Sequence, residues 1–287
     1  MNMLQRILIV ALCLLTPIVA HANAKYPNEP SGLTTATDCT FSGPTTSVCG
    51  IVDLYNSGIF TSDSTAPTSP SGVMKSLLLA YHGTGGGQWI YNTPSIVREM
   101  FVGHMWRTNP QFQGRIVSNK LFFVRGPVLG NAFWGMDGRL VPQMSTQFGP
   151  NTSGLDNSHT CAGGGFLCYP NVSNQLITIG AWTKFEVYVK SSTTATSRDG
   201  IVRWWVNGVL TGNYTNMNYA PGGLNEWQWN NTWDGAQDMG TSNTVDWEHW
   251  LDDLHISTGN GSGSGGSTPV DTTPPGRATG LTITQLN

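Results

Sequence analysis

Two neighbouring stretches of the chain alternate between apolar and polar residues, and this period of two constrains the fold more than any other feature of the sequence. In residues 182–190 (WTKFEVYVK) apolar side chains recur at every second position from Phe185 to Val189. Residues 201–210 (IVRWWVNGVL) repeat the pattern, with Val and Trp on one parity and Arg and Asn on the other. Such alternation predicts half-buried strands that turn one face to a core.

The link between these strands, residues 191–200 (SSTTATSRDG), is rich in Ser, Thr and Gly and favours a hairpin. In simple register the hairpin places Tyr188 beside Arg203 and Glu186 beside Trp205. The polar face of the hairpin is then either ordinary solvated surface or a platform for a sugar chain.

The composition supports an all-β, loop-rich protein. Charged residues make up 11% of the chain, against about 25% in typical domains, and glycines number 35. The net charge is −3 and no Lys/Arg cluster stands out, which excludes a nucleic acid as an electrostatic partner. The chain also carries 11 tryptophans, more than a core usually needs, so we expect some of them to face a ligand.

The first 24 residues have the pattern of a cleaved secretory signal peptide. A basic start containing Arg6 precedes an apolar run over residues 7–20, and Ala22-Asn23-Ala24 follows it. The run is too short for a transmembrane helix, so the sequence predicts secretion and no membrane span.

Four cysteines follow the expected signal peptide, and an even number in an exported chain favours disulfides. Of the three possible connectivities, pairing of neighbours is preferred, which joins Cys39 to Cys49 and Cys161 to Cys168. The spacing is wider than the Cys-x-x-Cys spacing of a metal-thiolate site.

The expected domain organisation is a β-sandwich over residues 25–258, a Gly/Ser linker over 259–270 and a new strand-like start over 271–287. The linker (GNGSGSGGSTPV) has the composition of a flexible connector. The last stretch contains the strand-like run Leu281-Thr282-Ile283-Thr284.

The motifs Trp182, Asp199-Gly200, residues 205–208 (WVNG) and residues 251–257 (LDDLHIS) together resemble the back half of a concanavalin A-like lectin/glucanase domain. The resemblance is closer to the secreted polysaccharide-lyase-like members of that superfamily. It implies a two-sheet antiparallel β-sandwich, or jelly roll, with one curved sheet forming a groove for a saccharide. Residues 271–287 resemble the truncated start of a fibronectin type III domain.

Glycoside hydrolysis is the less favoured chemistry. The glucanase branch of the superfamily carries Glu-x-Asp-x-Glu on one strand, and the nearest match is residues 244–248 (TVDWE). Thr244 stands at the position of the nucleophilic glutamate, and hydrolysis needs two carboxylates.

Polysaccharide β-elimination is the preferred enzymatic alternative. It needs a group that neutralises a uronate carboxylate and a base that removes the neighbouring proton. Tyr188 and Arg203 are candidates, with Lys184 assisting, although a simple cross-strand stacking pair is equally compatible with the pattern. The Arg-Ser/Thr-Glu-Leu-Arg, Gln-Ile/Val-His and Tyr-Phe-Lys-Ala-Gly motifs of alginate lyases are absent.

Sugar binding without turnover needs aromatic planes surrounded by polar side chains. We expect Trp204 and Trp227 in the core, and enzyme and binding module are equally compatible with the sequence. A third class, an adhesive or structural surface protein, is kept open by the fibronectin-like start. No cofactor is required, and the resemblance to carbohydrate-binding jelly rolls allows a structural Ca²⁺ at Asp252. The predicted carbohydrate-binding residues are Trp182, Glu186, Lys190, Trp205, Asn207, Gln228 and Trp229.

Overall fold

The fold is seen in a computed structural model that describes residues 25–42, 49–55, 58–78, 88–112, 119–127, 131–137, 143–151, 168–230 and 245–261. Predictions for residues 1–24, Cys161, Thr244, most of the linker and residues 271–287 lie outside these ranges. In the part of the chain that the structure describes, no helix is long and apolar enough to cross a membrane.

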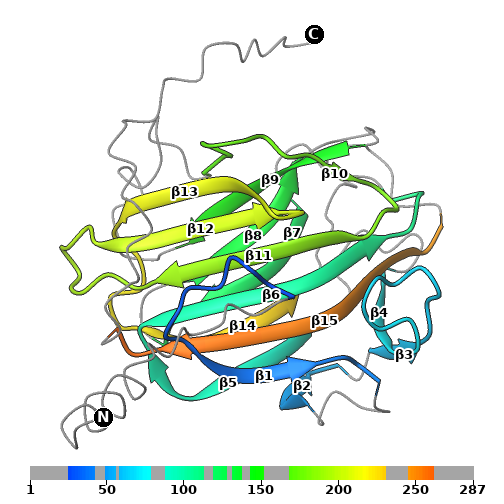
Figure 1. The fold of residues 1–287 in the computed structure, drawn as a ribbon, viewed down its shortest axis with the longest axis horizontal. Coiled ribbons are helices and arrows are strands. Elements are labelled where there is room, and N and C mark those ends of the chain that lie inside the picture. The colour runs from blue at the N-terminus through cyan, green and yellow to red at the C-terminus, as the bar shows by residue number, and fades with distance from the viewer. Residues whose placement is uncertain are drawn as a thin grey trace, which may run out of the picture.

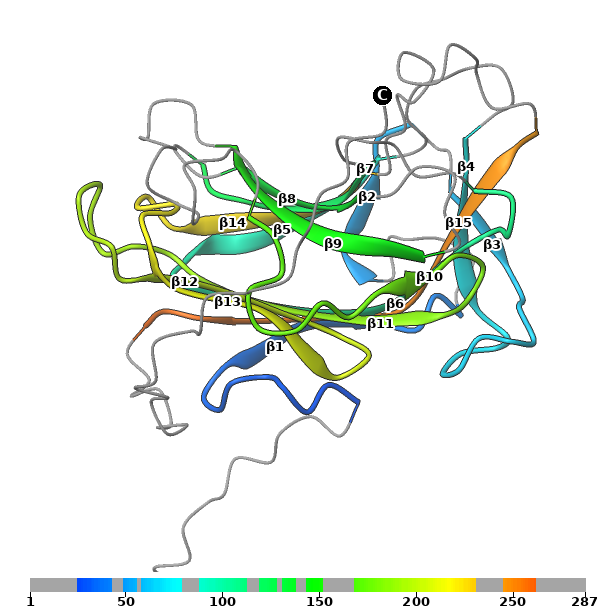
Figure 2. The same ribbon diagram turned by 90° about the horizontal axis from the view of Figure 1, so that it is seen from above.

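Two antiparallel sheets pack face to face, which confirms the predicted β-sandwich (Figures 1 and 2). Sheet A runs in the order β13 (Val209–Met217), β12 (Gly200–Val206), β11 (Thr183–Lys190), β6 (Glu99–Thr108), β15 (Trp247–Gly259), β4 (Val73–Leu78) and β3 (Ile59–Thr61), with β1 (Thr34–Cys39) paired to β15. Sheet B runs in the order β10 (Ile177–Thr178), β9 (Gln143–Asn151), β8 (Asn131–Asp137), β7 (Asn119–Arg125), β14 (Leu224–Asn230), β5 (Gln88–Val97) and β2 (Ile51–Asp53).

The central hairpin forms in the predicted register, with Tyr188 opposite Arg203. The second stretch is not one continuous strand, however. Asn207 and Gly208 both have positive φ, 52° and 80°, and form a two-residue turn from β12 to β13. Asn-Gly is the preferred sequence for such turns because both central residues must adopt φ above zero. The hairpin is therefore part of a three-strand meander.

The apolar side chains of both sheets point inward and meet in one core. Residues such as Val187 and Trp204 from sheet A lie with Phe122 and Trp227 from sheet B, and all four are fully buried. Trp204 and Trp227 were expected in the core, and the structure confirms both. A disulfide joins Cys39 to Cys49, as predicted.

The segment Lys25–Leu33, here called the strap, crosses the outer face of sheet A before β1 begins (Figure 2). Tyr26 is 1% exposed and sits directly over Gly103 of β6, where an added Cβ would lie 2.5 Å from the tyrosine ring. Glu29 of the strap contacts His255 of β15 at 3.2 Å. The strap therefore turns part of an outer sheet face into a second, smaller interior.

Candidate functional site

The two sheets offer two outer faces for a ligand. Figure 2 shows β7 and β8 of sheet B curving upward toward their ends, away from sheet A, so that the outer face of the sheet is concave along these strands. The strap and β1 lie on the opposite side of the sandwich, against the outer face of sheet A. The polar side chains predicted for the hairpin project from the outer face of sheet A. They therefore point away from sheet B.

Tyr188 and Arg203 are neighbours, but their surroundings do not make Tyr188 a base. The Tyr188 hydroxyl donates to Glu99 Oε2 at 2.8 Å and the side chain is buried. Burial raises the pKa of Tyr188 well above its ordinary value, and the hydrogen bond and charge of Glu99 add to this effect. Arg203 Nε donates to Asn213 Oδ1 at 2.8 Å. The pair thus behaves as a packed, hydrogen-bonded cluster.

Glu186 binds the strap through hydrogen bonds to Asn28. Its carboxylate is fully buried and accepts hydrogen bonds from the backbone N–H of Asn28 at 3.1 Å and from Asn28 Nδ2 at 2.9 Å. Lys184 Nζ lies 3.8 Å from the same carboxylate. Because both carboxylate oxygens already have partners, Glu186 does not offer an acceptor to a sugar hydroxyl.

The remaining predicted residues of sheet A separate along the strands. Lys184 and Asn207 meet at one end, where Asn207 Oδ1 accepts the backbone N–H of Lys184 at 2.9 Å. Trp182, half-exposed, precedes Lys184 by two positions. Lys190 lies at the other end of β11, opposite Glu99. Trp205 packs on the cluster around Tyr26 and Phe101. The structure thus brings three of these residues to one end and leaves the others apart.

Trp229 was predicted to bind carbohydrate, and the structure shows that this prediction was wrong. It lies on the inner face of sheet B, has no exposed surface, and packs against Trp89 with ring centroids 4.8 Å apart. It cannot stack on a sugar. Parity alone could not decide this, because a tryptophan suits a core and a binding face equally well.

Gln228 has the opposite parity and points to the outer face of sheet B. It is paired with Phe123 of β7 on one side and with Ile90 of β5 on the other. Its side chain is fully buried, and neither Nε2 nor Oε1 has a hydrogen-bond partner. An unpartnered buried amide costs about 1–3 kcal/mol per polar group, and His104 in the core carries the same kind of unpartnered atoms.

A charged pair lies on the same face, two positions along β14. Arg125 of β7 is opposite Glu226, and its Nη1 lies 3.2 Å from Glu226 Oε1. The Arg125 guanidinium also lies 4.4 Å from the centre of the Phe123 ring, and Lys120 Nζ lies 6.0 Å from it. We call Lys120, Phe123, Arg125, Glu226 and Gln228 the sheet B site.

Sequence reasoning named Gln228 but missed the basic residues beside it. The run 119–125 (NKLFFVR) was interpreted as a plain strand. The pairing of β7 with β8 shifts between Lys120 and Phe122, which puts Lys120 and Arg125 on one face although their positions differ in parity. Bulges of this kind are not visible in an alternation pattern.

Asp252, the residue that the sequence offered for a structural Ca²⁺, has one carboxylate oxygen bonded within the chain. Its Oδ2 accepts the backbone N–H of Ser69 at 3.0 Å, while Oδ1 is buried without a partner. Burial raises the pKa of Asp252 to about 6. Calcium takes six to eight oxygen ligands, and no three His, Cys, Asp or Glu side chains converge anywhere in the described ranges.

No protein-family model and no curated protein matches the chain. Solved structures do match it. A variant of the alginate lyase Aly36B in complex with alginate trisaccharide aligns with a TM-score of 0.52 and 14% identity, covering 73% of this chain and 98% of that one. The chain is thus similar in fold to a polysaccharide lyase.

The marine alginate lyase from Aplysia kurodai aligns with a TM-score of 0.50 and 15% identity, covering 78% of this chain and 99% of that one. The endo-beta-1,4-glucuronan lyase from the fungus Trichoderma reesei aligns with a TM-score of 0.48 and 14% identity, covering 71% of this chain and 88% of that one. At such identities the likeness is one of fold, and the chemistry must be argued from the residues themselves.

Proposed function

We propose that this chain is a secreted protein that binds a uronate-containing polysaccharide on the outer face of sheet B. The observation that carries the proposal is the partly exposed Arg125–Glu226 pair, with side chains 28% and 19% exposed, two positions along β14 from the buried carboxamide of Gln228, whose nitrogen and oxygen lack partners in the folded chain. A uronate residue supplies what is missing, because its carboxylate accepts hydrogen bonds and its hydroxyls donate them. The signal-like pattern of residues 1–24 supports secretion.

The neighbours of Gln228 suit the same ligand. Arg125 can form a charge-assisted hydrogen bond to a carboxylate, and Glu226 holds the guanidinium at 3.2 Å. The Phe123 ring is buried and lies 4.4 Å from the Arg125 guanidinium, which it supports. The partly exposed guanidinium of Arg125 on the outer face of sheet B suits an acidic pyranose chain.

Polysaccharide β-elimination is the second candidate, and the fold shared with the two alginate lyases favours it. In this reaction a base removes the proton beside the carboxylate and the electron pair forms a carbon–carbon double bond. The glycosidic oxygen leaves with its bonding pair and is protonated. Arg125 would neutralise the carboxylate and the Gln228 amide would donate a hydrogen bond to it, which makes that proton more acidic.

The test compares the purified chain with Gln228→Leu on a panel of uronate polymers, measuring retention on immobilised polymer and ultraviolet absorbance of unsaturated ends. The substitution conserves volume and removes the two unpartnered atoms, so the free energy of unfolding should stay unchanged or rise. Retention should weaken about tenfold or more, because one buried hydrogen bond to a charged group contributes about 1.5–3 kcal/mol. Gln111→Leu, at an exposed glutamine, is the matched control.

Each outcome distinguishes the candidates. Retention with formation of unsaturated ends, both lost in Gln228→Leu, establishes the lyase. Retention without product establishes the binding protein. A wild-type chain that neither binds nor cleaves any uronate polymer refutes both and leaves the adhesive or structural role. Equal retention of wild type and Gln228→Leu would refute the assignment to sheet B.

A further inference from the structure

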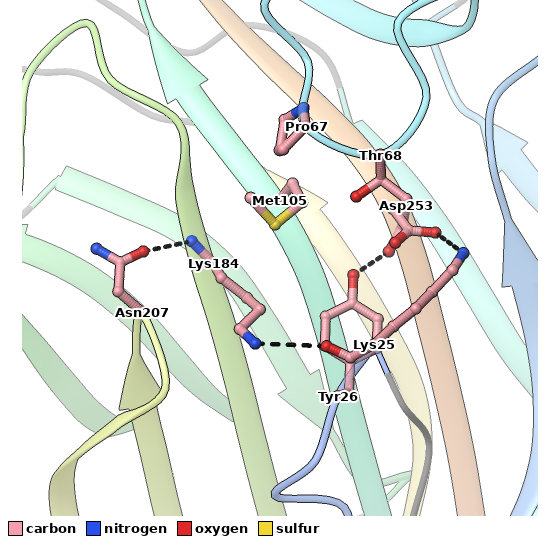
Figure 3. Close-up of a pocket in the computed structure, with 8 residues that line it drawn as sticks. All are labelled: Lys25, Tyr26, Pro67, Thr68, Met105, Lys184, Asn207 and Asp253. Atoms are coloured by element: carbon pink, nitrogen blue, oxygen red, sulfur yellow. Dashed lines mark hydrogen bonds and ion pairs between the residues drawn. The ribbon is translucent and has the colours of Figure 1, made fainter.

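A pocket of about 380 Å³ lies on the outer face of sheet A, on the side of the sandwich opposite the sheet B site (Figures 2 and 3). The strap closes one wall, the loop before β4 closes another, and β6, β11 and β15 supply the floor. The lining residues are Lys25, Tyr26, Pro67, Thr68, Met105, Lys184, Asn207 and Asp253. None of them belongs to the sheet B site.

The accessible charge of this pocket is positive. Lys184 Nζ lies 3.4 Å from the backbone oxygen of Lys25 and 3.8 Å from the Glu186 carboxylate. That carboxylate is fully buried, whereas 26% of the Lys184 side chain is exposed. Lys25 lies 2.5 Å from Asp253, but the lysine side chain is 45% exposed whereas that of Asp253 is 6% exposed. A ligand therefore meets the ammonium groups before the carboxylate.

An aromatic plane stands beside the pocket. Trp182 lies two positions before Lys184 on the same face of sheet A, which sets their backbones about 7 Å apart. Its indole is held in place, because Nε1 donates to Thr65 Oγ1 at 3.1 Å and the Arg107 guanidinium lies 5.4 Å from its centre. Arg107 is in turn fixed by Asp63 at 2.7 Å. The half-exposed indole is thus a preorganised surface.

We propose that Trp182, Lys184 and Asn207 form a second, non-catalytic binding site for an anionic saccharide. The indole stacks on the apolar face of a pyranose ring, the Lys184 ammonium binds a carboxylate or sulfate, and the exposed Asn207 amide bonds a hydroxyl. The inference uses the polysaccharide part of the proposed function and does not require an enzyme. Because the two sites lie on opposite faces, one protein can hold two polymer segments and gain avidity.

The experiment titrates the full chain with a short uronate oligosaccharide, alginate trisaccharide, by calorimetry, and compares Lys184→Gln with Lys190→Gln. Lys190 is a half-exposed lysine on the same strand and face but outside the pocket, so it is a matched control. The wild type should bind two oligosaccharides. Lys184→Gln should weaken one site about tenfold or more. Lys190→Gln should bind as the wild type does, and Trp182→Ala should weaken the same site as Lys184→Gln.

The results separate this inference from the proposed function. One binding event that is lost only in Gln228→Leu overturns the second site and leaves the sheet B site standing. One event that is lost only in Lys184→Gln supports the second site and overturns the sheet B assignment. No binding overturns both. Equal weakening by Lys184→Gln and Lys190→Gln would show a diffuse charge effect and would also overturn the second site.

Discussion

Replacing His104 with leucine should make the protein more stable, and increasingly so as the pH falls. His104 lies in the core with no exposed surface, and neither ring nitrogen has a hydrogen-bond partner. Its ring stacks on Phe185 with centroids 5.5 Å apart and meets Phe122 edge-on at 5.0 Å. Leucine is apolar and similar in size, so the substitution removes two buried unpartnered polar atoms at little cost in packing.

The pH dependence follows from the pKa of His104, which burial lowers from 6.5 to about 3. Below pH 6.5 the unfolded chain binds a proton that the folded chain does not take until the pH approaches 3. A depressed folded pKa of this kind contributes stability that is present above the unfolded pKa and is lost as the pH falls. At about 1.4 kcal/mol per pH unit, the wild type should lose about 2 kcal/mol relative to His104→Leu between pH 7 and pH 5.

Urea unfolding of both proteins at the two pH values measures this difference. His255→Gln is the control of opposite sign. Burial alone would lower the pKa of His255, but its hydrogen bonds to Glu29 and Asp38, at 3.2 and 2.6 Å, raise the pKa on balance. Its contribution is therefore full below pH 6.5 and is lost as the pH rises through the folded pKa. A gap between wild type and His104→Leu that is the same at pH 7 and pH 5 would refute the reasoning.

Two further stability predictions concern the strap and the disulfide. Gly103→Ala places a Cβ 2.5 Å from the Tyr26 ring and should lower the free energy of unfolding by about 1–3 kcal/mol. Adding Tyr26→Ala to this variant should restore part of the lost stability. Equal urea midpoints for Gly103→Ala and the wild type would contradict the close contact. Exchanging Cys39 and Cys49 together for serine opens a loop with a sequence separation of 10 and should cost about 2–3 kcal/mol by the same assay. The reduced wild type should be at least as destabilised, because reduction also opens the disulfide of Cys168.

The alternation pattern predicted the hairpin well because register in a half-buried sheet is strongly specified. A slip of one residue would have moved Val187 and Trp204 from the core to the outer face, and both are fully buried as expected. The same pattern could not distinguish the core from a binding face for tryptophans. Trp229 is core and Trp182 is surface, although both stand beside polar residues in the sequence.

Long-range pairing decided the features that the sequence did not reveal. Arg125 meets Glu226, 101 positions away, and Gln228 pairs with Phe123 and Ile90, which precede it by 105 and 138 positions. No local periodicity encodes these contacts. The sequence therefore predicted the fold and named one residue of the proposed sheet B site, while the basic residues required the three-dimensional pairing.

The strap explains why Glu186, on the polar face of the hairpin, was wrongly predicted to bind carbohydrate. Residues 25–33 (KYPNEPSGL) have no strand or helix periodicity, so their sequence does not predict that this segment covers a sheet. Yet Tyr26 fills the space above Gly103, and Asn28 satisfies Glu186. A polar parity is thus compatible with solvent, with a ligand, or with another part of the same chain. These cases differ in whether the polar side chain already has hydrogen-bond partners within the chain. The Glu186 carboxylate has such partners, whereas the Gln228 carboxamide does not.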